Sequence, residues 1–196
     1  VSALLSGVIL NLGVYGILLV NAELAPLASP YEGAVIIGVG AITALVGILY
    51  ANVDDDLKGT LAYSSIENLG IACTGLGVGF VFASEHQMAL ASIGFAAGAY
   101  HLVNHAAYKG LLFLGASTVD VKLGTRSMNK LGGVIRFLPV TAAFFLVGVL
   151  GIAAIPPLNG FASEWLTFEA LLRSAEIGRT DLRVLFALAG AALALT

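Results

Sequence analysis

Residues 88–119 read MALASIGFAAGAYHLVNHAAYKGLLFLGASTV and hold the most informative pattern in the chain. The stretch contains no proline and no interruption stronger than glycine, so it predicts one long continuous helix. At 1.5 Å per residue such a helix would be roughly 48 Å long, which exceeds the roughly 30 Å hydrocarbon core of a bilayer. We therefore expect it to tilt, kink or extend beyond the bilayer. Its interior nevertheless carries His101, His105 and Lys109.

The composition of the whole chain indicates a membrane protein. Of 196 residues, 59% are hydrophobic and 11% are charged, and the mean hydropathy is +0.97. Soluble domains carry roughly one quarter charged residues. The net charge of -3 argues against a nucleic-acid partner, and the single cysteine, Cys73, excludes an internal disulfide framework. We predict an all-α fold, a polytopic bundle of transmembrane helices.

Apolar runs and their flanking breakers predict a single transmembrane domain over residues 1–196. The predicted spans are residues 3–20, 33–52, 57–83, 88–119, 139–155 together with 161–172, and 184–196. The last run falls short of the roughly 20 residues that a span requires. We therefore expect this helix to be cut off and the chain to be a fragment of a larger fold.

The segment Pro156-Pro157-Leu158-Asn159-Gly160 interrupts the fifth predicted span. Proline removes backbone donors and disfavours a continuous helix. The second half, 161–172, is too short to cross a bilayer alone. We therefore predict one discontinuous helix, with its unwound backbone facing protein or water. The alternative is two separate membrane passages.

The basic residues of the loops predict an orientation. The first and third loops contain no lysine or arginine, and the second loop contains Lys58. The fourth loop carries Lys122, Arg126, Lys130 and Arg136. This bias places the second and fourth loops on the cytoplasmic side. A single broken span puts Arg173, Arg179 and Arg183 on the opposite side, against the rule.

Nearly all charged residues lie between the predicted spans, and the exceptions are functional candidates. They are Glu67, Lys109 and Glu164, with Glu169 about one turn beyond. A charge at the middle of a bilayer costs from about 3 to over 10 kcal/mol, so such residues face a bundle interior or a wet cavity.

The spacing of four residues places His101, His105 and Lys109 on one face of their helix, over roughly 12 Å. Histidine accepts and donates a proton near neutral pH. The stripe therefore predicts a proton relay, although each residue alone is also explained as an interhelical hydrogen-bond partner or a snorkelling lysine. A metal site on the two histidines is disfavoured, because no carboxylate or cysteine on this helix completes it and Lys109 repels a cation. We expect no metal and no cofactor.

Two carboxylates complete the candidate relay. Glu67 lies about ten residues into its span, near Ser64, Ser65 and Asn68. It is either a relay member or a structural partner for a lysine on another helix. Glu164 follows the proline break and is expected close to the point where the helix restarts, where free amides favour an ionised carboxylate.

These segments resemble, in this order, the family of proton-conducting antiporter-like membrane subunits. That family is shared by NADH:quinone oxidoreductases, multisubunit Na⁺/H⁺ (Mrp) antiporters and membrane-bound hydrogenases. The resemblance rests on Asp56-Leu57-Lys58, on the stretch from His101 to Leu114, on Leu131-Gly132-Gly133, and on Pro156-Pro157-Leu158-Asn159-Gly160-Phe161 with Ser163-Glu164-Trp165. Within the family it is most similar to the hydrogenase-4 or formate hydrogenlyase membrane subunit.

The resemblance implies that protons or Na⁺ move through hydrated half-channels joined by a line of lysine, histidine and glutamate. By position, Lys109 with His101 and His105 corresponds to the central line, and Glu164 to the exit-side residue on the broken helix. The family often has lysine or histidine in the first segment, whereas this chain has Ser6 and Asn11. The resemblance then implies that Glu67 supplies the titratable group of this early part of the relay.

The expected function is thus a proton- or cation-translocating subunit of a membrane-bound oxidoreductase or hydrogenase complex, without a redox active site of its own. The expected partners are other membrane and peripheral subunits, the lipid bilayer, and protons or Na⁺, in a bacterial or archaeal inner membrane. One alternative is a structural scaffold subunit without its own ion pathway. Another is a quinone-reactive membrane enzyme, which no cofactor-binding pattern supports.

Overall fold

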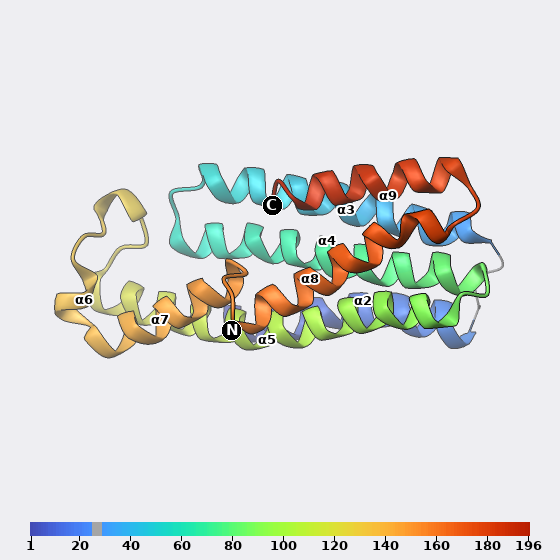
Figure 1. The fold of residues 1–196 in the computed structure, drawn as a ribbon. Helices are drawn as coiled ribbons and strands as arrows, with labels where there is room; N and C mark the ends of the chain where they lie inside the picture. Colours follow the sequence, from blue (N-terminus) through green and yellow to red (C-terminus); the bar gives the residue numbers. More distant parts are fainter. Residues whose placement is uncertain (25–28) are drawn as a thin grey trace.

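A bundle of long helices makes up the computed structural model, which describes residues 1–24 and 29–196 (Figure 1). Within these residues there is no β-strand, only an isolated bridge between Asp56 and Ser127. The long helices are α3 (Pro30–Val53), α4 (Leu57–Ser84) and α5 (Met88–Leu123). They run side by side in alternating directions, with α4 between α3 and α5 (Figure 1). The prediction of an all-α bundle is confirmed.

The N-terminal segment is helical throughout Ser2–Leu24, but its helix type changes along its length. It consists of α1 (Ser2–Leu4), the π-helical turn η1 (Leu5–Ile9), α2 (Leu10–Leu19) and a second π-helical turn, η2 (Val20–Leu24). The segment packs against α5 and α4. Gly7 in η1 allows this approach, because a Cβ atom there would lie 3.2 Å from the Ala106 carbonyl oxygen. Side chains of this segment therefore reach the polar face of α5.

Three helices of the described residues are long and apolar enough to cross a membrane: Ser2–Leu24, Pro30–Val53 and Leu57–Ser84. The α5 helix is long enough but more polar, and it ends at Gly124 in a left-handed conformation. Its length of about 54 Å exceeds the thickness of a hydrocarbon core. Of the three expectations for this helix, which were a tilt, a kink or an extension beyond the bilayer, the extension fits best. The last turn of α5 supports this, because Asp120 there pairs with Lys58.

The predicted broken span consists of two helices that follow one another along α5 (Figure 1). They are α7 (Pro139–Ile152) and α8 (Asn159–Leu172). The first half ends earlier than the predicted residue 155 because the positions before two successive prolines disfavour helical backbone. The second half starts at Asn159 rather than at residue 161. The arrangement confirms one discontinuous helix rather than two passages.

The remaining elements close the two ends of the bundle. At one end η3 (Met128–Lys130) and α6 (Val134–Phe137) connect α5 to α7. At the other end η4 (Arg173–Glu176) leads from α8 to α9 (Thr180–Leu193), which returns along α3 (Figure 1). The arginine-bearing connection between α8 and α9 therefore lies at the opposite end from the basic loop before α7, as a single broken span requires.

Small residues set the spacing of the central helices. A Cβ atom on Gly94 of α5 would lie 2.5 Å from the backbone nitrogen of Gly79 on α4, and one on Gly75 would lie 3.0 Å from the nitrogen of Gly98. The first distance is shorter than Cβ atoms allow and the second is very tight, so these glycines permit close helix packing. The α3–α4 interface is built in the same way around Gly77.

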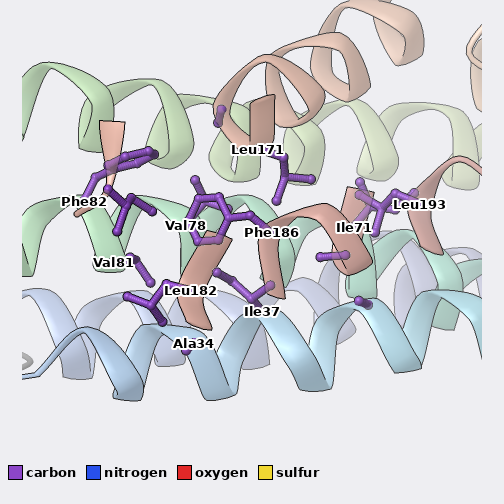
Figure 2. Packing of buried hydrophobic residues seen from close by; sticks show 14 of the residues in the cluster. Ala34, Ile37, Ile71, Val78, Val81, Phe82, Leu171, Leu182, Phe186 and Leu193 are labelled. Atoms are coloured by element: carbon purple, nitrogen blue, oxygen red, sulfur yellow. The ribbon is translucent and has the colours of Figure 1, made fainter. Parts of the chain in front are cut away.

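The largest apolar core lies where α3, α4, α8 and α9 meet (Figure 2). Phe82 of α4 and Phe186 of α9 pack edge to face, with their ring centroids 5.7 Å apart. The opposite side of α3 is apolar but exposed, as at Val35 and Ile42. Such a surface is suited to lipid or to another subunit rather than to water.

Candidate functional site

A stripe of three titratable side chains lies buried along one face of α5. His101 is 0% exposed, His105 1% and Lys109 0%. The four-residue spacing brings them onto the face that packs against α4, the N-terminal segment and α8. The predicted stripe is therefore closed off from the surroundings by three other parts of the chain.

His101 is held between α4 and α8. Its Nε2 atom lies 3.1 Å from Oδ1 of Asn68, and its Nδ1 atom lies 3.0 Å from the hydroxyl oxygen of Ser163. The Tyr108 hydroxyl donates to the same Asn68 oxygen at 2.8 Å. The Asn68 amide nitrogen donates to the Ser64 carbonyl at 2.7 Å. Each polar atom of Asn68 thus has a defined partner.

His105 is held by the N-terminal segment through Asn11. Its Nδ1 atom lies 3.1 Å from Oδ1 of Asn11, whose amide nitrogen donates to the carbonyls of Gly7 and Leu102. Because these carbonyls fix the amide orientation, Oδ1 accepts and the His105 Nδ1 atom carries the proton. The Nε2 atom is then a free acceptor, and it is buried without a hydrogen-bond partner in the described part of the chain. It is a place at which a proton or a water molecule can bind.

Lys109 points to α4. Its ammonium nitrogen donates to the Leu61 carbonyl at 2.8 Å, and the Ser65 hydroxyl donates to the same oxygen at 2.9 Å. Ser65 is in turn hydrogen-bonded to Ser6 of η1, with 2.5 Å between their oxygens. A charged lysine has three donors and no acceptor, so this single carbonyl leaves two donors for water or another acceptor.

The two carboxylates flank the stripe rather than pairing with it. Glu67 is 8% exposed, and its backbone packs against Gly47 of α3. Glu164 is half-buried on α8. In the part of the chain that the structure describes, ion pairs within 4.0 Å join Lys58 to Asp120, Arg126 to Asp56, Arg173 to Glu169 and Arg179 to Asp181. None of these includes Glu67, Lys109 or Glu164.

The expected place of Glu164 at the start of a helix is wrong. Because α8 begins at Asn159, Glu164 lies in its second turn, where backbone amides are already used within the helix. The start of α8 is instead bound to α5 by an amide pair. The Asn104 side chain donates to the Asn159 carbonyl at 2.8 Å, and the Asn159 side chain donates to Oδ1 of Asn104 at 2.9 Å.

The neutral partners of the stripe were not singled out as site residues from the sequence. Asn68 and Ser163 bond to His101 directly, Tyr108 bonds to Asn68, and Asn104 and Asn159 bond to each other beside the stripe. Ser6 and Asn11 enter the sequence analysis only as departures from a family pattern. One signal was present: Asn104 and Tyr108 each directly precede a predicted site residue on α5. Among the described residues no group of three His, Cys, Asp or Glu side chains is placed to hold a metal ion.

The loops at the α6 end are joined by polar contacts. Asp55 accepts from the Ser127 hydroxyl at 2.5 Å and from the Asn129 amide at 2.9 Å, and these bonds hold the pKa of Asp55 below its usual value. Arg126 pairs with Asp56 at 3.1 Å. The second and fourth loops of the sequence therefore lie together at one end of the bundle.

Comparison with known proteins gives relatives over the whole chain. Hydrogenase-4 component B of Escherichia coli (strain K12) is 43% identical over 197 aligned residues, which cover 100% of this chain and 29% of that protein. Formate hydrogenlyase subunit 3 of the same organism is 40% identical over 195 residues, with 100% and 32% covered. An Na(+)/H(+) antiporter subunit of Alkalihalophilus pseudofirmus is 41% identical over 143 residues, with 71% and 18% covered.

The chain spans less than a third of the length of these relatives. The resemblance to hydrogenase-4 and formate hydrogenlyase membrane subunits is confirmed, and the transmembrane character of the family agrees with the long apolar helices of an integral membrane protein. Residues 1–178 match the profile described as NADH:quinone oxidoreductase/Mrp antiporter, TM, and the chain belongs to that family.

Proposed function

We propose that this chain forms one transmembrane domain that carries protons within an antiporter-like subunit of a membrane-bound complex. The observation that carries the proposal is the buried stripe His101–His105–Lys109, which has no ion pair among the described residues. Buried charges that serve only to hold helices together are expected to be paired. Groups that must change their protonation state are better served by neutral partners and by free acceptors.

In the proposed mechanism a proton moves along α5 and leaves toward α8. The histidine stripe supplies the proton, neutral Lys109 accepts it, and water carries it toward Glu164. The free Nε2 acceptor of His105 supports this order, because it lies one helical turn from Lys109. Glu67 acts on the α4 side of Lys109, and a change of its charge would alter the affinity of the lysine for a proton.

The names of the relatives suggest the setting. Hydrogenase-4 component B, formate hydrogenlyase subunit 3 and the Na(+)/H(+) antiporter subunit are parts of assemblies. We propose that this chain likewise works with other membrane and peripheral subunits in a bacterial inner membrane. Protons are preferred to Na⁺ as the ion because the stripe offers nitrogen bases rather than a cluster of oxygen ligands.

The test uses the full-length protein in its complex, in inverted membrane vesicles. Lys109→Ala and Glu164→Gln are expected to abolish proton uptake driven by the complex while assembly is retained. The matched controls are Lys122→Ala, which removes an exposed lysine from the same helix, and Glu169→Gln, which removes the surface partner of Arg173 from α8. Normal uptake in either site variant would refute the proposal, and loss of assembly in both would favour the scaffold function instead.

A further inference from the structure

Ser163 lies on α8 with its hydroxyl between His101 and two carbonyls of the α8 backbone. The oxygen is 3.0 Å from Nδ1 of His101, 2.9 Å from the Gly160 carbonyl and 3.4 Å from the Asn159 carbonyl. The side chain is completely buried, so water does not compete for it. A serine hydroxyl has one proton, and it can therefore donate to His101 or to the α8 backbone but not to both.

The surroundings of His101 fix which of its nitrogens carries a proton in the neutral state. The Asn68 amide nitrogen faces the Ser64 carbonyl, so Oδ1 of Asn68 faces Nε2 of His101. An amide oxygen only accepts hydrogen bonds, and therefore Nε2 of His101 is the donor. The lone pair of neutral His101 lies on Nδ1 and accepts the Ser163 hydroxyl.

When His101 takes up a proton, that proton must bind at Nδ1, because Nε2 already carries one. The new Nδ1–H group donates to the Ser163 oxygen, and the serine hydroxyl turns to the Gly160 carbonyl. Gly160 lies in the first turn of α8, directly after the break, and in the helix its carbonyl also receives the amide of Glu164 four residues on. The charge of His101 is thus linked to the turn of α8 that carries Glu164.

We infer that Ser163 is a positioning residue of the proton path: its hydroxyl stabilises the proton that His101 takes up at Nδ1 and transmits the charge of His101 to the first turn of α8. This inference rests on the proposed function, because it requires that His101 changes its protonation state. The other titratable groups in the surroundings are His105, Tyr108 and Lys109 on α5, Glu67 on α4 and Glu164 on α8. Among these, His101 alone contacts Ser163 in the described hydrogen bonds.

The experiment compares Ser163→Thr with Ser163→Val in the full-length complex in inverted vesicles. The two side chains have the same shape, and they differ in the hydroxyl group. Threonine in a helix donates to the carbonyls three or four residues earlier, as Ser163 does. We expect the valine variant to pump protons about tenfold more slowly at neutral pH and to recover as the pH is lowered, because the imidazolium has lost a charge-assisted hydrogen bond. The threonine variant should keep the wild-type pH profile.

A second pair of variants separates a structural role from the proposed one. Thr167→Val removes another buried hydroxyl from the same face of α8. The Thr167 hydroxyl donates only to the Ser163 carbonyl in the described hydrogen bonds, so its loss should leave the pH profile unchanged. Equal pH profiles for Ser163→Thr and Ser163→Val would overturn the inference, as would a loss in Ser163→Val that is the same at every pH. If Lys109→Ala abolishes pumping while Ser163→Val does not slow it, this inference fails and the proposed function stands. If Lys109→Ala pumps normally, the proposed function itself fails.

Discussion

The spacing of α4 and α5 gives a prediction that combines packing with the candidate site. Gly94→Ala places a Cβ atom 2.5 Å from the Gly79 nitrogen and 2.7 Å from its α-carbon. Ordinary van der Waals contact needs at least 3.4 Å, so the two backbones must separate by nearly 1 Å. Overpacking of this kind costs about 1–3 kcal/mol, because backbone on both sides has no side-chain freedom to relieve it.

Gly16→Ala is the matched control. Nothing lies within 4 Å of a Cβ atom at Gly16 in α2, so alanine there meets open space. In a helix such a replacement stabilises by roughly 0.5–1 kcal/mol. The same chemical change is therefore expected to have opposite signs at the two positions, with a lower melting temperature for Gly94→Ala and an unchanged or higher one for Gly16→Ala.

The assay is thermal unfolding of the purified full-length protein in detergent, followed by the loss of its monodisperse peak in size-exclusion chromatography. Proton pumping by Gly94→Ala should also fall, because wider spacing of α4 and α5 lengthens the bond between His101 and Asn68. A melting temperature for Gly94→Ala at or above that of the wild type would show that the two helices are not packed as closely as described.

Three further outcomes follow from named contacts. Asn159→Ala removes the bond that the Asn159 side chain donates to Oδ1 of Asn104, and it leaves that buried oxygen without this donor, while the backbone carbonyl of residue 159 still accepts from Asn104. It should destabilise the α7–α8 break by about 1–3 kcal/mol, seen as faster hydrogen–deuterium exchange of the first turn of α8. The pKa of Asp55 is lowered, so its stabilising contacts with the 127–129 loop are present at neutral pH and are lost as the pH falls below 3.8, the ordinary pKa of an aspartate. Hydrogen–deuterium exchange of those loop amides should therefore rise in acid, and Asp55→Asn should abolish that rise. Lys58→Ala removes a partly exposed ion pair with Asp120, and because such pairs are screened by solvent the melting temperature should change little while pumping persists.

The titratable part of the site could be predicted from the sequence because its signal is local. A charged residue inside an apolar run is conspicuous, and the spacing of His101, His105 and Lys109 is regular within one helix. The neutral partners carry no such signal. His105 and Asn11 are 94 positions apart, and Ser163 and His101 are 62 apart. Serine and asparagine are neutral and occur in several helices of this chain, so only the packing of the bundle shows which of them meet a titratable group.

The boundaries of the elements show the same division between local and tertiary causes. Proline disfavours the interior of a helix, yet Pro30 is the first residue of α3, where Ser29 caps the helix and the missing amide of proline costs nothing. The break in the discontinuous helix was assigned to Pro156–Gly160 but extends over 153–158. Asn159 restarts the helix because Asn104 on another helix holds it, which the local sequence does not show.

The central claim is that Lys109 carries protons. Its most direct test is the number of protons taken up per catalytic turnover of the full complex in inverted vesicles, compared between the wild type and Lys109→Ala at equal levels of assembled complex. The account predicts that turnover continues in Lys109→Ala while proton uptake driven by the complex is abolished. An unchanged ratio of protons to turnovers would contradict it.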